Sequence, residues 1–170
     1  MIVLPQLNQP VMKKIIAILL FFSINIALNA QKSSEEKAVK KTIENFFKGF
    51  HKGDTLLLKK TIHKNLIAQT TFTSKKGDKV LRSTPNVYKT LMDFAKKVKP
   101  TDDYDEKILS YKILVDGNLA SVWTPYEFYN KGKFSHCGVN SFQLFNNNGN
   151  WEIIYLIDTR RRNACKAAKK

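Results

Sequence analysis

The most constraining feature of this sequence is a change in the spacing of apolar residues near position 104. From there to residue 159 apolar and polar side chains alternate, as they do in strands that bury one face. Turn sequences interrupt the alternation, and one of them, Asp116-Gly117, suits a two-residue hairpin because both residue types tolerate positive φ. Lys131-Gly132 predicts a second turn and residues 146–149 a third. The stretch therefore predicts an antiparallel meander of four strands: 104–115, 118–129, 133–145 and 150–159.

The residues before this meander favour helices. Apolar residues recur at helical spacing between Val39 and Phe50, which predicts a helix with one apolar face. Ser33 and Glu36 form a capping-box pattern at its start, and Gly53 is a suitable end. The sequence therefore predicts a first helix of about five turns.

Two further helices and one strand are predicted before residue 104. Asp54 is a good N-cap for a short second helix, and Pro85 suits the first position of a third. Between them, residues 66–73 have the composition of a strand. Helices followed by an antiparallel meander define the α+β class, with the helices on one face of the sheet.

The N-terminal thirty residues differ from the rest. Lys13 and Lys14 precede an apolar run that ends near Ala30, which is typical of a secretory signal peptide. The run is short for a membrane span, and an N-terminal anchor is the alternative. Met12 is then a candidate for the true start. We expect a signal peptide at 1–30, one domain at 31–162 and a basic tail at 163–170, with a periplasmic or secreted protein that keeps no stable membrane span after cleavage.

The predicted mature chain is strongly basic. From residue 31 it carries 27 basic and all 14 acidic residues, a formal charge of +13. Such a surplus suits nucleic acid, anionic membranes or acidic ligands. Export argues against nucleic acid, so we expect none as a partner.

The two cysteines leave two alternatives open. Cys137 lies within a predicted strand and Cys165 in the basic tail. In an oxidising compartment they can pair, or they can remain one buried and one exposed thiol. Their spacing matches no zinc motif, and no nucleotide-binding or nucleophile-elbow motif is present. We expect no metal and no cofactor.

The order of elements resembles the nuclear transport factor 2-like superfamily. Residues 36–53 resemble its first helix and turn, and 118–123 and 149–154 resemble two of its strands. The run 134–142, together with 158–160, is similar to a subgroup of exported bacterial members. The resemblance implies a cone-shaped, cystatin-like roll in which three N-terminal helices pack on a curved antiparallel sheet. The superfamily includes ketosteroid isomerases, dehydratases, cyclases and non-catalytic binding domains, so the resemblance does not assign an activity.

His136 and Asp158 are the candidate catalytic residues. His136 and Asn140 are four residues apart on one predicted strand, so they point to the same face. If Phe145 pairs with Trp151, Asp158 and Arg160 share that face; a shift of one residue moves them to the other face. In the first register Asp158 can orient His136 as a base.

Aromatic and polar residues are the candidates for ligand contacts. Aromatic side chains either line a pocket for a flat molecule, or form core or a dimer face. Pro125 indicates an edge or a bulge in their strand, because it lacks an amide donor. The candidates are Trp123, Tyr126, Asn140, Arg160, Phe47 and Phe50.

Three functions fit these residues. The favoured one is a non-catalytic domain that binds an unknown small molecule or a protein partner. The alternative is a cofactor-free isomerase, dehydratase or cyclase that uses a His/Asp base in the pocket. The third is a homodimer formed through the sheet face, which is compatible with either of the others.

Overall fold

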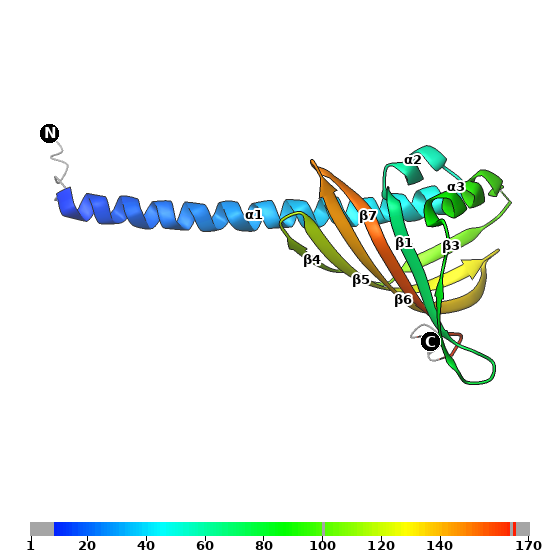
Figure 1. Cartoon of the computed structure of the whole chain (residues 1–170). Helices are drawn as coiled ribbons and strands as arrows, with labels where there is room; N and C mark the ends of the chain where they lie inside the picture. Colours follow the sequence, from blue (N-terminus) through cyan, green and yellow to red (C-terminus); the bar gives the residue numbers. More distant parts are fainter. Residues whose placement is uncertain (1–8, 100, 164, 166–170) are drawn as a thin grey trace. The chain divides into compact units, whose positions relative to one another are not determined.

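The computed structural model describes residues 9–99, 101–163 and 165, in two compact units that meet between Glu35 and Glu36 (Figure 1). The helices are α1 (Gln9–Lys52), α2 (Thr55–Lys59) and α3 (Val87–Lys97). The strands are β1 (Ile62–Thr73), β2 (Lys79–Ser83), β3 (Tyr104–Ile108), β4 (Lys112–Asp116), β5 (Leu119–Asn130), β6 (Lys133–Asn147) and β7 (Asn150–Arg160).

The first helix is longer than the sequence predicts. α1 is continuous through Ser33 and Glu36, so the capping-box pattern at these residues does not begin a helix. The first unit is helical from Gln9 to Glu35. In the part of the chain that the structure describes, no helix has the length and apolar character needed to cross a membrane. The signal peptide remains a prediction.

The other two helices begin close to their predicted positions. Asp54 is the N-cap of α2, where its carboxylate accepts a hydrogen bond from the Leu57 amide at 2.9 Å. α3 begins at Val87, two residues after Pro85. Its N-cap, Asn86, has a left-handed backbone (φ 48°) and makes no side-chain capping bond. The chain thus turns sharply before α3 instead of entering it directly at the proline.

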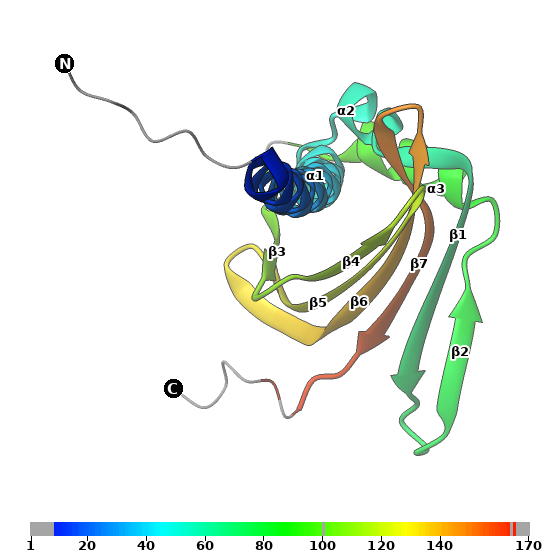
Figure 2. The ribbon, with the colours of Figure 1, turned by 90° about the vertical axis from the view of Figure 1, so that its left-hand side faces the viewer.

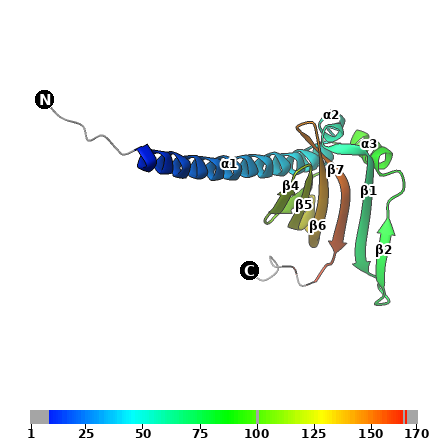
Figure 3. The same cartoon turned by 60° about the vertical axis from the view of Figure 1, so that its left-hand side comes forward.

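The second unit contains a mixed sheet of seven strands in the order β2-β1-β7-β6-β5-β3, with β4 also paired to β5. The strands bend together into one curved sheet (Figure 2). β1 lies between β2 and β7 (Figure 3) and pairs with β7 in parallel. The predicted all-antiparallel sheet is therefore wrong at this one pairing. β1 comes before the meander in the chain, and α3 and the whole meander separate it from β7. This long connection lets the two strands run in the same direction.

The predicted strand 104–115 is two strands. β3 and β4 both pair with β5 and are separated by residues 109–111. At the break, the Leu109 amide donates to the carbonyl of Pro125 on β5 at 2.9 Å. Pro125 has no amide to return, so a regular ladder cannot continue there. The expectation of an edge or a bulge in the strand of Pro125 is wrong: β5 is an internal strand with regular pairing to β6 at this residue, and the break lies in the strand opposite.

An extra residue in β7 decides which of its side chains face the helices. Near the turn, Phe145 pairs with Glu152, so the register is shifted by one residue from a pairing of Phe145 with Trp151. Ile154 is then left without a partner, because the flanking pairs are Leu144 with Ile153 and Gln143 with Tyr155. This bulge moves the following residues by one position. Trp151 and Ile153, before the bulge, consequently point to the same face as Leu156, Asp158 and Arg160 after it. Without the bulge, odd-numbered and even-numbered residues of the strand would point to opposite faces.

The core of the second unit lies between α1 and this face of the sheet. Phe46 and Phe47 of α1 both make edge-on contacts with Phe142 of β6, at ring-centroid distances of 6.2 and 6.0 Å. Phe142 and Ile153 are completely buried. Burying a side chain of this size contributes about 1.5–3 kcal/mol. α1 is therefore fixed on the sheet mainly by apolar contacts around Phe142.

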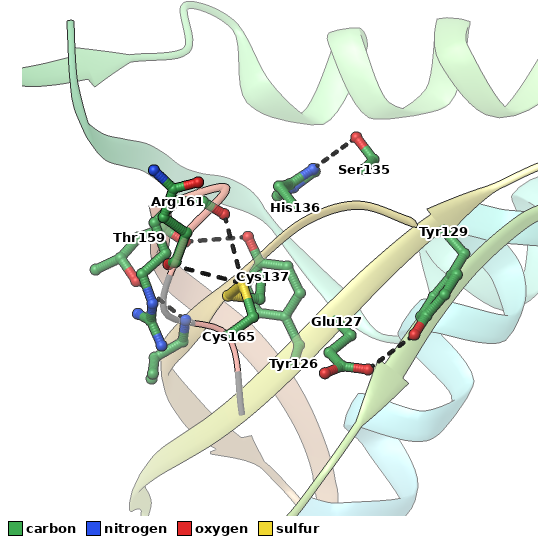
Figure 4. Close-up of a disulfide and its surroundings, with 11 residues drawn as sticks. Tyr126, Glu127, Tyr129, Ser135, His136, Cys137, Thr159, Arg161 and Cys165 are labelled. Carbon is green, nitrogen blue, oxygen red and sulfur yellow. Dashed lines mark hydrogen bonds between the residues drawn. A yellow bond between two sulfur atoms is a disulfide. The ribbon is translucent and has the colours of Figure 1, made fainter. Parts of the chain in front are cut away.

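Cys137 and Cys165 form a disulfide (Figure 4). Their Cα atoms are 5.9 Å apart and both residues are buried. Next to it, the backbones of Cys137 and Arg161 exchange two hydrogen bonds of 2.9 Å, so the chain continues alongside β6 after β7 ends. The structure thus selects the paired alternative, and residue 165 belongs to the folded domain instead of to a free tail.

We predict that the double variant Cys137→Ser/Cys165→Ser is less stable by about 3 kcal/mol, because a cross-link over 28 residues restricts the unfolded chain. Urea unfolding followed by circular dichroism measures this difference. A reductant should lower the wild type to the level of the variant and leave the variant unchanged. Equal stabilities without reductant would contradict the disulfide.

Candidate functional site

The second unit contains a cavity of about 310 Å³ between the helices and the inner face of the sheet. Its walls are mainly aromatic and aliphatic, and its polar groups come from β1, β3, β5, β6 and β7. Residues that line it are Phe46, Phe47, Phe50, Ala68, Gln69, Thr70, Thr84, Val87, Leu91, Phe94, Tyr104, Glu106, Tyr126, Phe128, His136, Asn140, Leu156, Asp158 and Arg160. An apolar cavity of this size with a few polar groups is typical of a site for a small organic molecule.

Asp158 is the centre of the polar cluster in this cavity. One carboxylate oxygen accepts a hydrogen bond of 2.6 Å from the Thr70 hydroxyl, across the parallel β1–β7 pair. The other accepts bonds from the Tyr126 hydroxyl at 3.1 Å and from Nε of Arg160 at 2.7 Å. The Asp158 side chain is only 10% exposed. Three hydrogen-bond donors and the surrounding side chains hold the carboxylate in one position. Its oxygens are therefore acceptors with a fixed orientation.

Tyr126 reaches Asp158 by lying across the intervening strand. It starts on β5, and its hydroxyl contacts the carbonyl of Thr159 on β7 at 3.1 Å (Figure 4). Between them on β6 is Gly138, the cross-strand partner of Tyr126. A Cβ on Gly138 would lie 1.7 Å from the Thr159 carbonyl oxygen and 2.9 Å from the tyrosine ring. The glycine therefore provides the space in which the ring lies, and burial and Asp158 raise the pKa of the phenol.

Glu106 supplies a second carboxyl group to the cavity. It comes from β3, and one of its oxygens accepts a hydrogen bond of 2.7 Å from the Asn140 amide nitrogen. Burial raises its pKa from the ordinary 4.5 to about 7, an effect to which the charge of Asp158 adds; Asn140 and Arg160 oppose it. Near neutral pH this carboxyl therefore exists in both protonation states.

His136 also faces the cavity, from β6. Its Nδ1 lies 3.1 Å from the Ser135 hydroxyl (Figure 4). Its ring contacts Phe128 at a centroid distance of 5.1 Å. Burial and the nearby Arg160 lower its pKa, which favours the neutral imidazole. Asp158 does not orient it through a hydrogen bond: the described partners of the carboxylate are Thr70, Tyr126 and Arg160.

The structure brings seven of the eight sequence-predicted site residues to one cavity. These are Phe47, Phe50, Tyr126, His136, Asn140, Asp158 and Arg160. Trp123 is the exception: it lies on the opposite face of β5 and is 51% exposed. Alternation along β5 places Ala120, Val122, Thr124 and Tyr126 inward and therefore Trp123 outward. The expected ligand contact by Trp123 is wrong for this cavity.

Further exposed apolar side chains lie on the same outer face of the sheet as Trp123. Leu114, Leu119, Trp123 and Phe145 are between 38 and 59% exposed. Leu119 and Phe145 are cross-strand partners, so part of this group is contiguous. The homodimer through this face stays a prediction.

Glu106 and Thr70 are the polar residues that the sequence analysis missed. Glu106 stands between Tyr104 and Ile108 at alternating positions, and a carboxyl at an inward position of a strand is a usable signal. Thr70 gives no such signal, because its role depends on the parallel pairing of β1 with β7. Among the described residues, no three histidine, cysteine or acidic side chains gather as metal ligands would.

Comparison with known proteins supports the fold. No family model matches the chain, and no curated protein matches it. Solved structures do match. A nuclear transport factor 2-like protein of unknown function from Shewanella baltica is 16% identical, with a TM-score of 0.53 over 77% of this chain and 97% of that one. A protein of unknown function from Mycobacterium tuberculosis is 10% identical, with a TM-score of 0.62 over 83% of this chain and 80% of that one.

A third match is a proposed dehydratase of the same fold from Streptomyces avermitilis, 9% identical with a TM-score of 0.53 over 76% of this chain and 97% of that one. At these identities the comparisons concern the fold alone. The chain therefore has the nuclear transport factor 2-like fold of the α+β class, with helices packed on a curved sheet that is not closed.

We predict that Glu106 makes stability fall as pH rises from about 4.5 to about 7, by roughly 3 kcal/mol. Over this range the unfolded chain releases the proton while the folded chain keeps it, so ionisation favours unfolding. Below 4.5 both states are protonated, and above 7 both are charged. The difference in unfolding free energy between wild type and Glu106→Gln, measured in urea at each pH, isolates this contribution.

The exposed Asp116 provides the control for this measurement. Asp116→Asn should show the pH dependence of the wild type. If the difference in unfolding free energy between wild type and Glu106→Gln does not change from pH 4 to 8, the pKa of Glu106 is not raised by folding and the prediction is wrong.

Proposed function

We propose that this chain is an exported protein that binds a small, partly apolar organic molecule in the cavity of the second unit. The observation that carries the proposal is the cavity itself: about 310 Å³, with aromatic walls and one polar cluster. Two carboxyl groups and an arginine stand among the apolar walls, as do the few polar groups that orient a ligand in such a site.

Two observations support export. The N-terminal pattern is that of a secretory signal peptide. The Cys137–Cys165 disulfide is a second, independent one, because disulfides persist mainly outside the reducing cytosol. Both are consistent with a protein that meets its ligand in the periplasm or outside the cell.

The state of Asp158 favours binding over catalysis by the expected pair. A general base must have a free lone pair directed at the substrate. Asp158 already accepts three hydrogen bonds, and it makes none to His136. Rigid acceptors and donors of this kind suit recognition of a ligand in one orientation.

We predict that the full chain binds 2-naphthamide, a flat neutral probe, with a dissociation constant of about 1 mM or tighter. Isothermal titration calorimetry measures it. Ala68→Phe places a ring in the cavity and should abolish binding. The matched control is Ile67→Phe, because Ile67 is the neighbouring residue on the outer face and is 56% exposed. No binding by the wild type, or unchanged binding by a folded Ala68→Phe, would contradict the proposal.

One observation favours a second candidate function. Glu106 lies in the cavity with a pKa of about 7, and a carboxyl group of that pKa can take a proton from a substrate and return it at neutral pH. The His136 imidazole lies in the same cavity as a potential donor. We propose a cofactor-free isomerase or dehydratase as this alternative, with Glu106 in place of the expected His136 and Asp158 as the base.

Deuterium exchange into 2-tetralone tests this alternative, because its α-hydrogens exchange when a base removes them. We predict that the wild type exchanges these hydrogens faster than buffer alone does, and that Glu106→Gln lowers the rate of the protein-catalysed exchange at least about 100-fold. Proton NMR in D₂O measures the exchange. Asp116→Asn should exchange at the wild-type rate. If the wild type does not exceed the buffer rate, this function is wrong and the binding function is unaffected.

A further inference from the structure

We propose that the ligand of this cavity is an apolar carboxylic acid whose carboxylate is bound by Arg160, with Arg82 as a second cation beside it. The inference rests on the proposed binding function and names the chemical class of its ligand. It follows from the position, the hydrogen bonding and the surroundings of the Arg160 side chain.

Arg160 offers the unused edge of a fixed guanidinium group. Its Nε donates to Asp158 at 2.7 Å, which sets the plane of the group. Within the described part of the chain, its two terminal nitrogens make no hydrogen bond and no ion pair. The side chain is 54% exposed, whereas that of Asp158 is 10% exposed. The free edge therefore lies on the solvent side of the polar cluster, where a ligand can reach it.

A carboxylate is the ligand group that matches this edge. The terminal nitrogens of a guanidinium present parallel N–H donors, which bind both oxygens of a carboxylate at once. A neutral carbonyl or hydroxyl uses only one of these donors. Asp158 does not compete for them, because Thr70 and Tyr126 also hold its oxygens in place.

A second arginine lies on the same face of the sheet. Arg82 of β2 pairs with Thr70 of β1, which pairs with Asp158 of β7, so all three side chains point to one side. The Arg82 guanidinium lies 4.7 Å from the centre of the Phe72 ring, and Phe72 is the parallel partner of Arg160. The backbones of the arginines are two strand spacings apart across the sheet and two residues apart along the strands, roughly 12 Å in all. Because both side chains are long, an anion between the two guanidinium groups can contact both.

The cavity provides for the rest of such a molecule. Phe46, Phe47, Phe50, Leu91 and Phe94 form apolar walls. The other carboxyl group, Glu106, is bonded by Asn140 and takes up a proton near neutral pH, which reduces its repulsion of an anion. The formal charge of +15 of the whole chain adds a general attraction for anions.

The test compares 2-naphthoate with 2-naphthamide, its neutral isostere, by isothermal titration calorimetry on the full chain at low salt. We expect the acid to bind about tenfold tighter or more, because two charge-assisted hydrogen bonds replace one neutral bond. Arg160→Gln should reduce the ratio of the two affinities to about one while 2-naphthamide still binds. Arg82→Gln should reduce the ratio by a smaller factor.

Arg161→Gln is the matched control, because Arg161 is the next residue and is not among the residues that line the cavity. It should keep the wild-type ratio. Arg160→Lys keeps the charge without the parallel donors and should give an intermediate ratio, which also tests the site if Arg160→Gln fails to fold. Equal affinities of the wild type for acid and amide would overturn the inference and leave the binding function standing. Binding of neither would overturn both.

Discussion

The site in this protein depends on one extra residue in the last strand. Without the bulge at Ile154, the hairpin register near the turn would send Asp158 and Arg160 to the outer face, while Trp151 and Ile153 stayed in the core. With it, one strand supplies apolar side chains to the packing against α1 and charged side chains to the cavity. Every polar contact described for Asp158 follows from this local irregularity.

Much of the architecture could be predicted because it depends on local signals. The helical spacing before Phe50, the Asp54 cap and the hairpin turns each depend on a few adjacent residues, and each appears in the structure. The parallel pairing of β1 with β7 could not be predicted, because it joins residues almost ninety positions apart. The continuous α1 shows the opposite case, where a local capping pattern at Ser33 and Glu36 does not begin a helix because the chain before it is already helical.

The orientation of β5 marks the limit of pattern reasoning for the site. Both faces of this strand carry large side chains, so alternation alone does not decide which face is buried, and Trp123 lies outside the cavity. Tyr126 lines the cavity, and its contact with Asp158 depends on Gly138, whose missing side chain lets the ring cross β6. Glu106 carries a usable signal, its alternation with Tyr104 and Ile108, but the direction in which this strand faces follows only from its pairing with β5.

The disulfide described above has a topological consequence for the polar cluster. Its sulfur bridge closes a covalent ring of chain from Cys137 to Cys165, and Asn140, Asp158 and Arg160 all lie within that ring. When heat or a denaturant unfolds the protein and the bridge stays intact, these three residues remain within one short closed loop. The distances between them in the unfolded chain are therefore limited. After transient unfolding, these three polar groups thus search a small volume for one another.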